Sequence, residues 1–205
     1  MRRTPPHSFS PFDMAACVVN LSSILPDCAA LTSVAGVRDF FYACRRVDFS
    51  AAPTVSASGT VTAVAITATK LKKIQGRKFQ NSGAYEMSKN ATGKTRFKHT
   101  VNARVYHRTQ ADRAAIQQFA LVEDLVVFMP NNDGQIEVFG LNLGLTPTSG
   151  KGGTGIKLDD DNTFLFAFEG EEPNLPAYYN TVLTPTTDAA DLITNLAALD
   201  AMVGA

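Results

Sequence analysis

The chain has 205 residues, of which 45% are apolar and 19% are charged, and its 19 basic and 19 acidic side chains balance to a net charge of zero. A chain of this length buries enough apolar surface to fold without disulfide or metal staples. The balanced charge excludes a protein that packages nucleic acid by charge alone and a disordered acidic tail. Its apolar runs are shorter than the ~18 residues of a membrane span, so no transmembrane segment is predicted.

The N-terminal quarter of the chain is poor in helical patterns. Residues 1–16 are rich in Pro and Ser and predict an extended arm, after which residues 17–185 are expected to form the main domain. Residues 17–47 predict one or two short strands. The small residues of 51–59 predict a linker or loop, and the Val, Ile and Thr of residues 60–68 predict a strand.

A long hairpin is predicted over residues 73–108, because its second half alternates at every position. One face of residues 95–108 is largely apolar and consists of Phe97, His99, Val101, Ala103, Val105 and His107. The other face is basic and polar and consists of Arg96, Lys98, Thr100, Asn102, Arg104 and Tyr106. This period of two is typical of an antiparallel strand with one buried and one solvated face.

After this strand the apolar period changes to that of a helix. Thr109 is a suitable N-cap for a helix over residues 110–121. Two apolar runs then flank Asp133-Gly134, a dipeptide that favours a hairpin turn. Residues 144–162 are rich in Gly, Thr and Pro and predict a long functional loop.

The last third of the chain predicts one strand and one helix. Residues 163–168 place Phe164, Phe166 and Phe168 on one face of a strand. Residues 186–205 are expected to form a C-terminal amphipathic helix, with Thr186 or Thr187 as its cap. The helical spacing is carried by Leu192, Ile193, Leu196, Leu199 and Val203.

Charge is segregated along the sequence although the net charge is zero. Residues 70–108 contain eleven basic residues and one acidic residue, whereas residues 123–205 contain thirteen acidic residues and two basic ones. The pattern predicts a basic surface and an acidic surface on one molecule. Such surfaces either complement each other between identical subunits or offer the basic side to an anionic partner such as DNA.

Motifs for catalysis or metal binding are missing from the sequence. Residues 144–152 differ from a phosphate-binding loop, because five residues separate the first glycine from the Gly150-Lys151 pair and Gly152 follows the lysine. Cys17, Cys28 and Cys44 form no CxxC pair and are expected to be buried thiols. We therefore expect no enzyme, no catalytic residue, no metal and no cofactor.

Several segments together resemble the C-terminal half of phage tail-tube-like virion proteins. An aromatic strand that ends in a Gly-Glu-Glu segment after a Gly-rich loop carries most of the resemblance. These segments are the stretch from Glu123 through Asp133-Gly134, Phe139-Gly140, Gly144-Leu145, residues 150–155 (GKGGTG) and residues 166–172 (FAFEGEE). Residues 17–42, with Cys28 and Gly36-Val37, resemble the N-terminal region of these proteins. The resemblance covers about residues 17–173, and residues 1–16 and those after Pro185 lie outside it.

The resemblance implies a mainly β fold, an antiparallel sandwich or partly closed barrel with one flanking helix. It implies a subunit of a phage tail tube that forms stacked, hexameric rings around a DNA-conducting channel. The expected partners are further copies of the chain, other tail or connector proteins and phage DNA passing without sequence-specific binding, all within the virion tail. The interface or channel residues are then expected to be charged: Arg77, Lys78, Arg96, Lys98, Arg104, Asp159, Asp160, Asp161, Glu169, Glu171 and Glu172.

Two alternatives remain open at the level of sequence. The first is a head–tail connector or tail-terminator ring of the same fold, which differs from a tube by not polymerising. The second is a β-sandwich binding module that grips DNA or an anionic glycan with the basic hairpin. Such a module normally stacks bases or sugars on aromatic side chains, and Tyr106 is the only aromatic residue on the basic face of residues 96–106.

Overall fold

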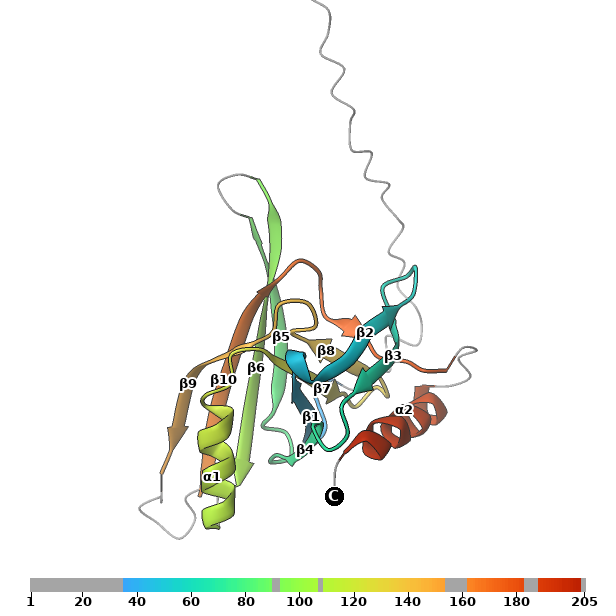
Figure 1. The fold of residues 1–205 in the computed structure, drawn as a ribbon. Coiled ribbons are helices and arrows are strands. Elements are labelled where there is room, and N and C mark those ends of the chain that lie inside the picture. The colour runs from blue at the N-terminus through green and yellow to red at the C-terminus, as the bar shows by residue number, and fades with distance from the viewer. Residues whose placement is uncertain (1–34, 90–92, 107–108, 154–161, 183–187, 204–205) are drawn as a thin grey trace, which may run out of the picture. The chain divides into compact units, whose positions relative to one another are not determined.

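Antiparallel strands make up most of the fold. The structure is a computed structural model, and it describes residues 35–89, 93–106, 109–153, 162–182 and 188–203. Within these residues the strands form a five-stranded, a four-stranded and a two-stranded sheet, and two α-helices accompany them (Figure 1). The fold class is therefore the expected one, a mainly β sandwich, and the sheets do not close into a barrel.

The five-stranded sheet is the central layer of the sandwich. Its strand order is β11-β8-β7-β1-β4, with bounds Ala177–Tyr178, Ile136–Phe139, Leu125–Pro130, Phe40–Arg45 and Lys72–Gln75. Every residue of β7 is buried. A continuous apolar run such as Leu-Val-Val-Phe-Met is typical of a strand that is covered on both faces, and this sheet is so covered.

The four-stranded sheet packs against one face of the central layer. Its strand order is β5-β6-β10-β9, with bounds Ser82–Lys89, Thr95–Tyr106, Thr163–Glu172 and Thr146–Gly152. The core between the two sheets contains Phe41 and Val127 from the central layer and Val101, Phe166 and Phe168 from the four-stranded sheet. Alternate residues of β6 and β10 therefore point into the core.

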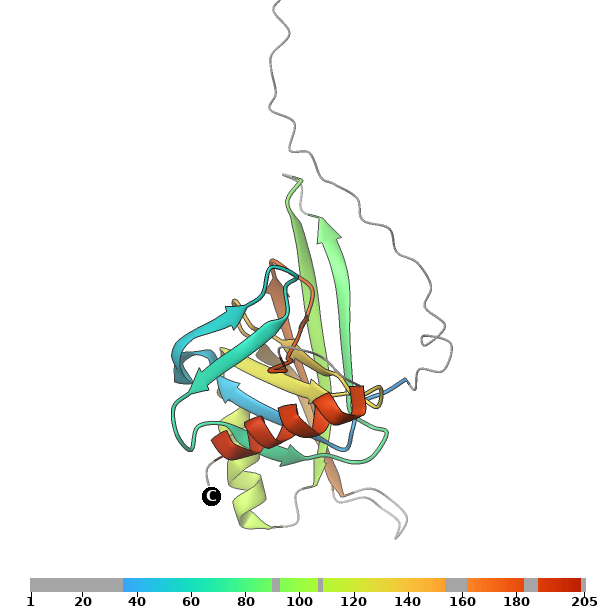
Figure 2. The same ribbon diagram turned by 90° about the vertical axis from the view of Figure 1, so that its right-hand side faces the viewer.

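The other face of the central layer is covered by a hairpin and the C-terminal helix. The hairpin consists of β2 (Phe49–Val55) and β3 (Val61–Ile66), and the helix is α2 (Asp188–Met202), drawn in red in Figure 2. A second core forms here from Tyr42, Phe128, Val138, Leu192 and Leu199, among other residues. The helix thus packs into the same compact unit as the strands, residues 34–205.

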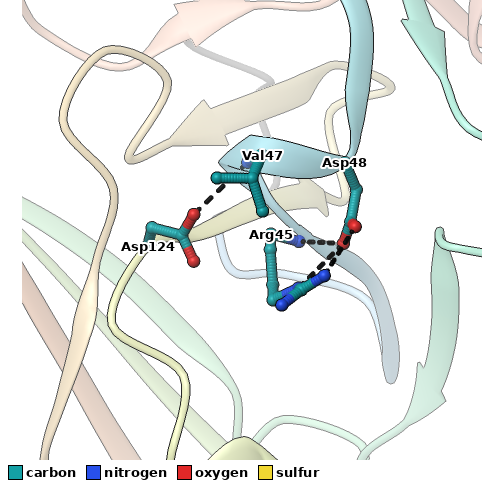
Figure 3. Close-up of polar contacts among 4 residues, drawn as sticks. All are labelled: Arg45, Val47, Asp48 and Asp124. Atoms are coloured by element: carbon teal, nitrogen blue, oxygen red, sulfur yellow. Dashed lines mark hydrogen bonds and ion pairs between the residues drawn. The ribbon is translucent and has the colours of Figure 1, made fainter.

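A short 3-10 helix, η2 (Arg46–Asp48), turns the chain from β1 into β2. Asp48 accepts hydrogen bonds from the Arg45 guanidinium at 2.9 and 3.2 Å, while the carboxylate of Asp124 accepts one from the Val47 backbone N–H (Figure 3). Partial burial disfavours the charge on Asp48, but the hydrogen bonds and charge of Arg45 outweigh it and hold the carboxyl pKa below its usual value. The corner between the strands is therefore fixed by charge as well as by packing.

Several sequence predictions are confirmed by the structure. Helix α1 spans Gln110–Phe119, and the Thr109 side chain accepts from the backbone of Asp112, whose carboxylate in turn accepts from the Thr109 backbone. The apolar runs around Asp133-Gly134 pair as β7 and β8. His99, Val101, Ala103 and Val105 share the buried face of β6, and β3, β10 and α2 lie where strands and a helix were predicted.

Four predictions of local structure are wrong. Residues 51–55, predicted as a linker, belong to β2, which pairs irregularly with β3 and so tolerates Pro53. The hairpin predicted over 73–108 spans β5 and β6 only, because β4 leaves it to pair with β1. The predicted loop 144–162 contains strand β9, Thr146–Gly152. Ile193 of α2 faces solvent with 70% of its surface exposed, since the adjacent Leu192 occupies the core.

Candidate assembly surface

One broad surface of the described fold is covered by no described helix or strand. It is the face of the four-stranded sheet that points away from the core, here called the outer face. Cross-strand register puts the following residues on it: Ser82, Ala84, Glu86 and Ser88 of β5; Arg96, Lys98, Thr100, Asn102, Arg104 and Tyr106 of β6; Leu165, Ala167, Glu169 and Glu171 of β10; Ser149 and Lys151 of β9. The outer face is therefore mostly polar, with small side chains between its charges.

Charges of both signs meet on the outer face. The ammonium of Lys98 lies 2.9 Å from a carboxylate oxygen of Glu169 on the neighbouring strand. This hydrogen bond is the main reason why the pKa of Lys98 is raised, and the charges of Glu169, Glu86 and Glu171 add to it. The basic and acidic segments, far apart in the sequence, thus meet within one chain. Basic and acidic residues are therefore separated along the sequence but not on the outer face.

Both edges of the four-stranded sheet are open among the described residues. The edge strand β5 pairs only with β6, and the edge strand β9 pairs only with β10. An edge strand presents a row of unpaired backbone N–H and C=O groups, which is a template for a further strand. The eight residues of β5 contain no proline and are exposed except for half-buried Gly83. In β9, Pro147 and a bulge beside Ser149 make the edge less regular.

The predicted interface residues do not all lie on one surface. Arg96, Lys98, Arg104, Glu169 and Glu171 share the outer face. In contrast, Lys78 lies in the turn between β4 and β5, and Arg77 lies where that turn begins, with its backbone N–H bonded to the Arg104 carbonyl. Asp159, Asp160 and Asp161 lie outside the described residues.

Glu172, also predicted as an interface residue, does not lie on the surface of the subunit, because its side chain is fully buried. One carboxylate oxygen accepts hydrogen bonds from the backbone N–H groups of Asn142, Leu143 and Gly144 at 3.1, 2.8 and 3.2 Å. Glu172 therefore ties the end of β10 to the loop after β8. Glu172 and Phe168 are separated by an even number of positions, so on a strand both side chains point to the same, inner face. This spacing is the sequence signal for the position of Glu172.

His99 fixes the same region from β6, as expected of a structural histidine. Its Nδ1 accepts from the Gly140 backbone N–H at 3.4 Å, which assigns the proton to Nε2, and Nε2 donates to the Asn174 carbonyl at 3.0 Å. Burial lowers the pKa of His99, while the bond to Asn174 and the charge of Glu172 partly oppose this shift. The neutral ring is thus the form that fits the fold.

An apolar hollow, which the sequence did not reveal, lies between α1 and the core that separates the two larger sheets. We call it the α1 groove; it has a volume of about 470 Å³. Its walls are apolar, and its rim contains the polar side chains of Lys73, Gln75, Thr109 and Asp112. The apolar wall consists of Phe41, Ile74, Val105, Ile116, Phe119, Phe166 and Phe168. No residue of α1 is buried, so the helix covers the core end incompletely.

A larger hollow of about 540 Å³ lies at the C-terminal end of α1 and has a mixed charged lining that includes Arg45, Lys70, Lys72 and Asp124. Cys44 also lines it. Burial, followed by the charges of Asp48 and Asp124, raises the pKa of this thiol to about 12, so Cys44 is an unreactive packed residue.

No cluster of three or more His, Cys, Asp or Glu side chains suited to a metal occurs among the described residues. Neither described helix has the length and apolar character that crossing a bilayer requires. Comparison of the chain with protein-family models, with curated proteins and with solved structures finds no match.

Proposed function

We propose that the chain is a structural subunit of a phage tail tube, which assembles into stacked, hexameric rings around a channel for DNA. One observation supports this proposal most: the four-stranded sheet has a polar outer face and two open edges. Open strand edges make a monomer prone to aggregation, because their unpaired backbone groups can pair with a strand of another chain. In a closed ring of subunits every such edge has a partner.

Ring formation would use the two edges of the four-stranded sheet against each other. If β5 of one copy lies beside β9 of the next, the sheet continues from subunit to subunit and closes on itself. The outer face then lines the lumen, and the central layer with α2 supports it from outside. The β5–β6 hairpin is the longest strand pair that includes an open edge and offers the most backbone for such a contact.

The composition of the outer face suits the passage of DNA rather than its retention. Lys98 is neutralised by Glu169, and Glu86 and Glu171 lie beside it. Small polar residues such as Thr100, Asn102 and Ser149 fill the space between the charges. DNA affinity scales with the number of unopposed cations that contact phosphates, so this mixed face binds DNA weakly.

A head–tail connector or terminator ring of the same fold is the nearest alternative, and a DNA-binding module is the alternative from another class. Electron microscopy of the purified full chain over a range of concentrations separates all three. We expect tubes of stacked rings. Single rings at every concentration support a connector or terminator, and monomers throughout overturn the proposal.

The triple variant R96Q/K98Q/R104Q tests the binding module directly, because these residues share the outer face. A tube subunit keeps its ability to assemble in this variant, and neither variant nor wild type is retained on DNA at physiological salt. A binding module gives retention of the wild type and its loss in the variant. The matched control is R113Q, which removes a cation from the exposed face of α1.

A further inference from the structure

The open edge strand β5 carries two large apolar side chains that the subunit leaves exposed. Tyr85 and Met87 have 51% and 71% of their surfaces in solvent. Register pairs them with His99 and Phe97 of β6, so they lie on the core-facing side of the sheet, where the core does not cover them. Single exposed apolar residues are ordinary, but two neighbours on an unpaired edge mark a contact surface.

The backbone of the same two residues also points to the open edge. The Arg104 N–H donates to Oδ1 of Asn81 at 3.0 Å, and its carbonyl accepts from the Arg77 N–H at 2.9 Å, so the Arg104 backbone faces β5. Backbone groups of antiparallel strands alternate in direction along the chain. Followed through the register of β6 and β5, this alternation turns the N–H and C=O of Tyr85 and Met87 away from their own sheet.

The opposite edge, β9, has room for large side chains on its core-facing side. The same alternation, followed through β10, turns the N–H and C=O of Gly150 and Gly152 to this edge. A Cβ atom at either glycine would lie 2.8 or 2.6 Å from the ring of Phe164, which therefore lies against the β9 backbone. Beside this ring the core-facing side of β9 consists of backbone alone, and glycine in a strand suits close approach by another group.

The outer-face sides of the two edges have opposite charges. Glu86 lies between the two apolar residues of β5, and Lys151 lies between the two glycines of β9; both side chains are exposed. Glu86 acts by its charge on Lys98, whose ammonium is bonded to Glu169. No ion pair within the described part of the chain includes Glu86 or Lys151.

One register matches the two edges at three consecutive positions. β5 and β9 run in opposite directions, and rotation about a ring axis preserves strand direction, so the next copy continues the sheet antiparallel. The three opposed pairs are Glu86 with Lys151, Tyr85 with Gly152 and Met87 with Gly150. The aromatic ring and the thioether then lie over glycine backbone beside Phe164, a favourable surrounding for both.

Neighbouring registers lose this match. A shift by two residues in either direction separates Glu86 from Lys151, and in one direction it also puts Met87 opposite Thr148, which has a side chain of its own. A shift by one residue puts outer-face side chains of one copy against core-facing side chains of the next. The charges and the glycines therefore select the same register independently.

The stagger of this register is that of a closed barrel. Glu86 lies level with Lys98 on β6, and Lys151 lies level with Arg104, six positions further along that strand. Each four-stranded sheet is then offset by about 20 Å along the strands and about 19 Å across them, at ~3.3 Å per residue and ~4.8 Å per strand. The strands tilt by about 45° from the ring axis for any number of copies, at the upper end of the usual 35–45°.

We propose that β5 of one copy pairs with β9 of the next in the register that sets Glu86 opposite Lys151, with Tyr85 and Met87 packed over Gly152 and Gly150. The proposal deepens the proposed function, on which it rests for the expectation that copies form rings. The exposed ion pair fixes the register and contributes little affinity, and burial of the two apolar side chains supplies most of the affinity. The occupant of each edge is a second copy of this chain.

Disulfide trapping tests the register in the full chain. Positions 86 and 151 form a pair without backbone hydrogen bonds between them, which is the closer type of cross-strand pair and lies within disulfide reach. E86C/K151C should give covalent chains of copies on mild oxidation, with peptide mapping joining positions 86 and 151. The matched control E86C/S149C is shifted by two residues on the same face and should give less than a tenth of this yield. An equal or higher yield in the control overturns the register.

Charge reversal tests the pair without a covalent bond. E86K and K151E should each raise the protein concentration needed for assembly at least fivefold, and E86K/K151E should return it to within twofold of the wild type. E86K/R113E has the same net charge, but its second exchange lies on the exposed side of α1. Equal rescue by E86K/R113E overturns the pair, because net charge then explains the effect.

The apolar part of the contact has a control of equal exposure. M87S should raise the assembly concentration at least tenfold with an unchanged melting temperature, because Met87 is exposed in the subunit. I193S removes a side chain that is 70% exposed on α2 and should leave assembly unchanged. Equal effects of M87S and I193S overturn the role of Met87.

Electron microscopy of the same samples separates the register from the tube. If the wild type forms tubes and E86C/K151C gives no link between positions 86 and 151, the register is wrong and the proposed function stands. If that link forms in open chains or pairs and rings are absent at every concentration, the register stands and the tube is wrong. Monomers throughout, with no link in any variant, overturn both.

Discussion

The central five-stranded sheet and the four-stranded sheet beside it differ in how much of each is covered. The central sheet has side chains from other elements on both of its faces, and β7 is buried along its whole length. The four-stranded sheet has one covered face, one polar outer face and two open edges among the described residues. The first is therefore the part that holds the subunit together, and the second is the part that is left for partners.

The largest effect is expected where the central sheet is most deeply buried. Phe128 on β7 is inaccessible to solvent and packs edge-on against Tyr179 with ring centres 5.6 Å apart. Phe128→Ala should lower the free energy of unfolding by about 3–5 kcal/mol, because it leaves a cavity that the core cannot close. Denaturant titration measures the loss. The control is Leu165→Ala on the outer face, with an expected loss of about 1 kcal/mol; equal losses would contradict the division between the sheets.

The second effect separates two neighbouring glutamates of β10. Glu172→Gln should cost about 1.5–3 kcal/mol of stability, because the buried carboxylate is the acceptor for three backbone N–H groups. Glu171→Gln, one residue away on the outer face, should change stability by less than about 0.5 kcal/mol. Denaturant titration of both variants tests whether the inner and outer faces of β10 have different roles. The reverse order of losses would show that they do not.

The third effect is a pH dependence of stability that comes from His99. Since the folded-state pKa is lowered below the ordinary value of about 6.5, the unfolded chain takes up a proton at pH values where the folded chain does not. Stability is therefore full above pH ~6.5 and falls as the pH decreases from there towards the folded-state pKa. Urea midpoints between pH 8 and pH 5 measure the slope, and His99→Gln should flatten it. An unchanged slope in this variant assigns the dependence to other groups.

The smallest effect is expected on the outer face itself. Lys98 and Glu169 are both partly exposed, and ion pairs in such a setting contribute little to stability. Lys98→Met should leave the melting temperature unchanged within error. The variant should be more prone to nonspecific association, because the outer face loses a charge. Differential scanning calorimetry checks the first statement. A marked drop in melting temperature would make the outer face a stabilising element of the subunit.

The sequence predicts those parts of the fold that local patterns determine. The alternation of β6, the capping of α1 by Thr109 and the Asp133-Gly134 hairpin all depend on neighbours in the chain, and all three are confirmed. The pairing of β4 with β1 and of β9 with β10 depends on distant partners. For this reason β9, which is rich in Thr and Gly and contains a proline, was predicted as part of a loop.

The candidate surface is predictable only in part for the same reason. Alternation places Arg96, Lys98 and Arg104 on one polar face, as the structure confirms. Glu169 joins this face because β6 pairs with β10, a strand more than 50 positions away in the sequence. Charge counts along the chain carry no information about such a pairing. The positive φ angle of Phe79, +62°, is a property of the folded backbone and has no signature in a residue pattern.

The central claim is that the open edges of the four-stranded sheet pair between copies, and hydrogen exchange of the free subunit and of the assembled protein tests it most directly. Backbone amides of β5 and β9 that point away from their own sheet should exchange at least a hundredfold more slowly in the assembly, because each gains a strand partner. Amides of the β2–β3 hairpin should exchange at the same rate in both. Unchanged exchange in β5 and β9, in a sample that has assembled, would contradict the account.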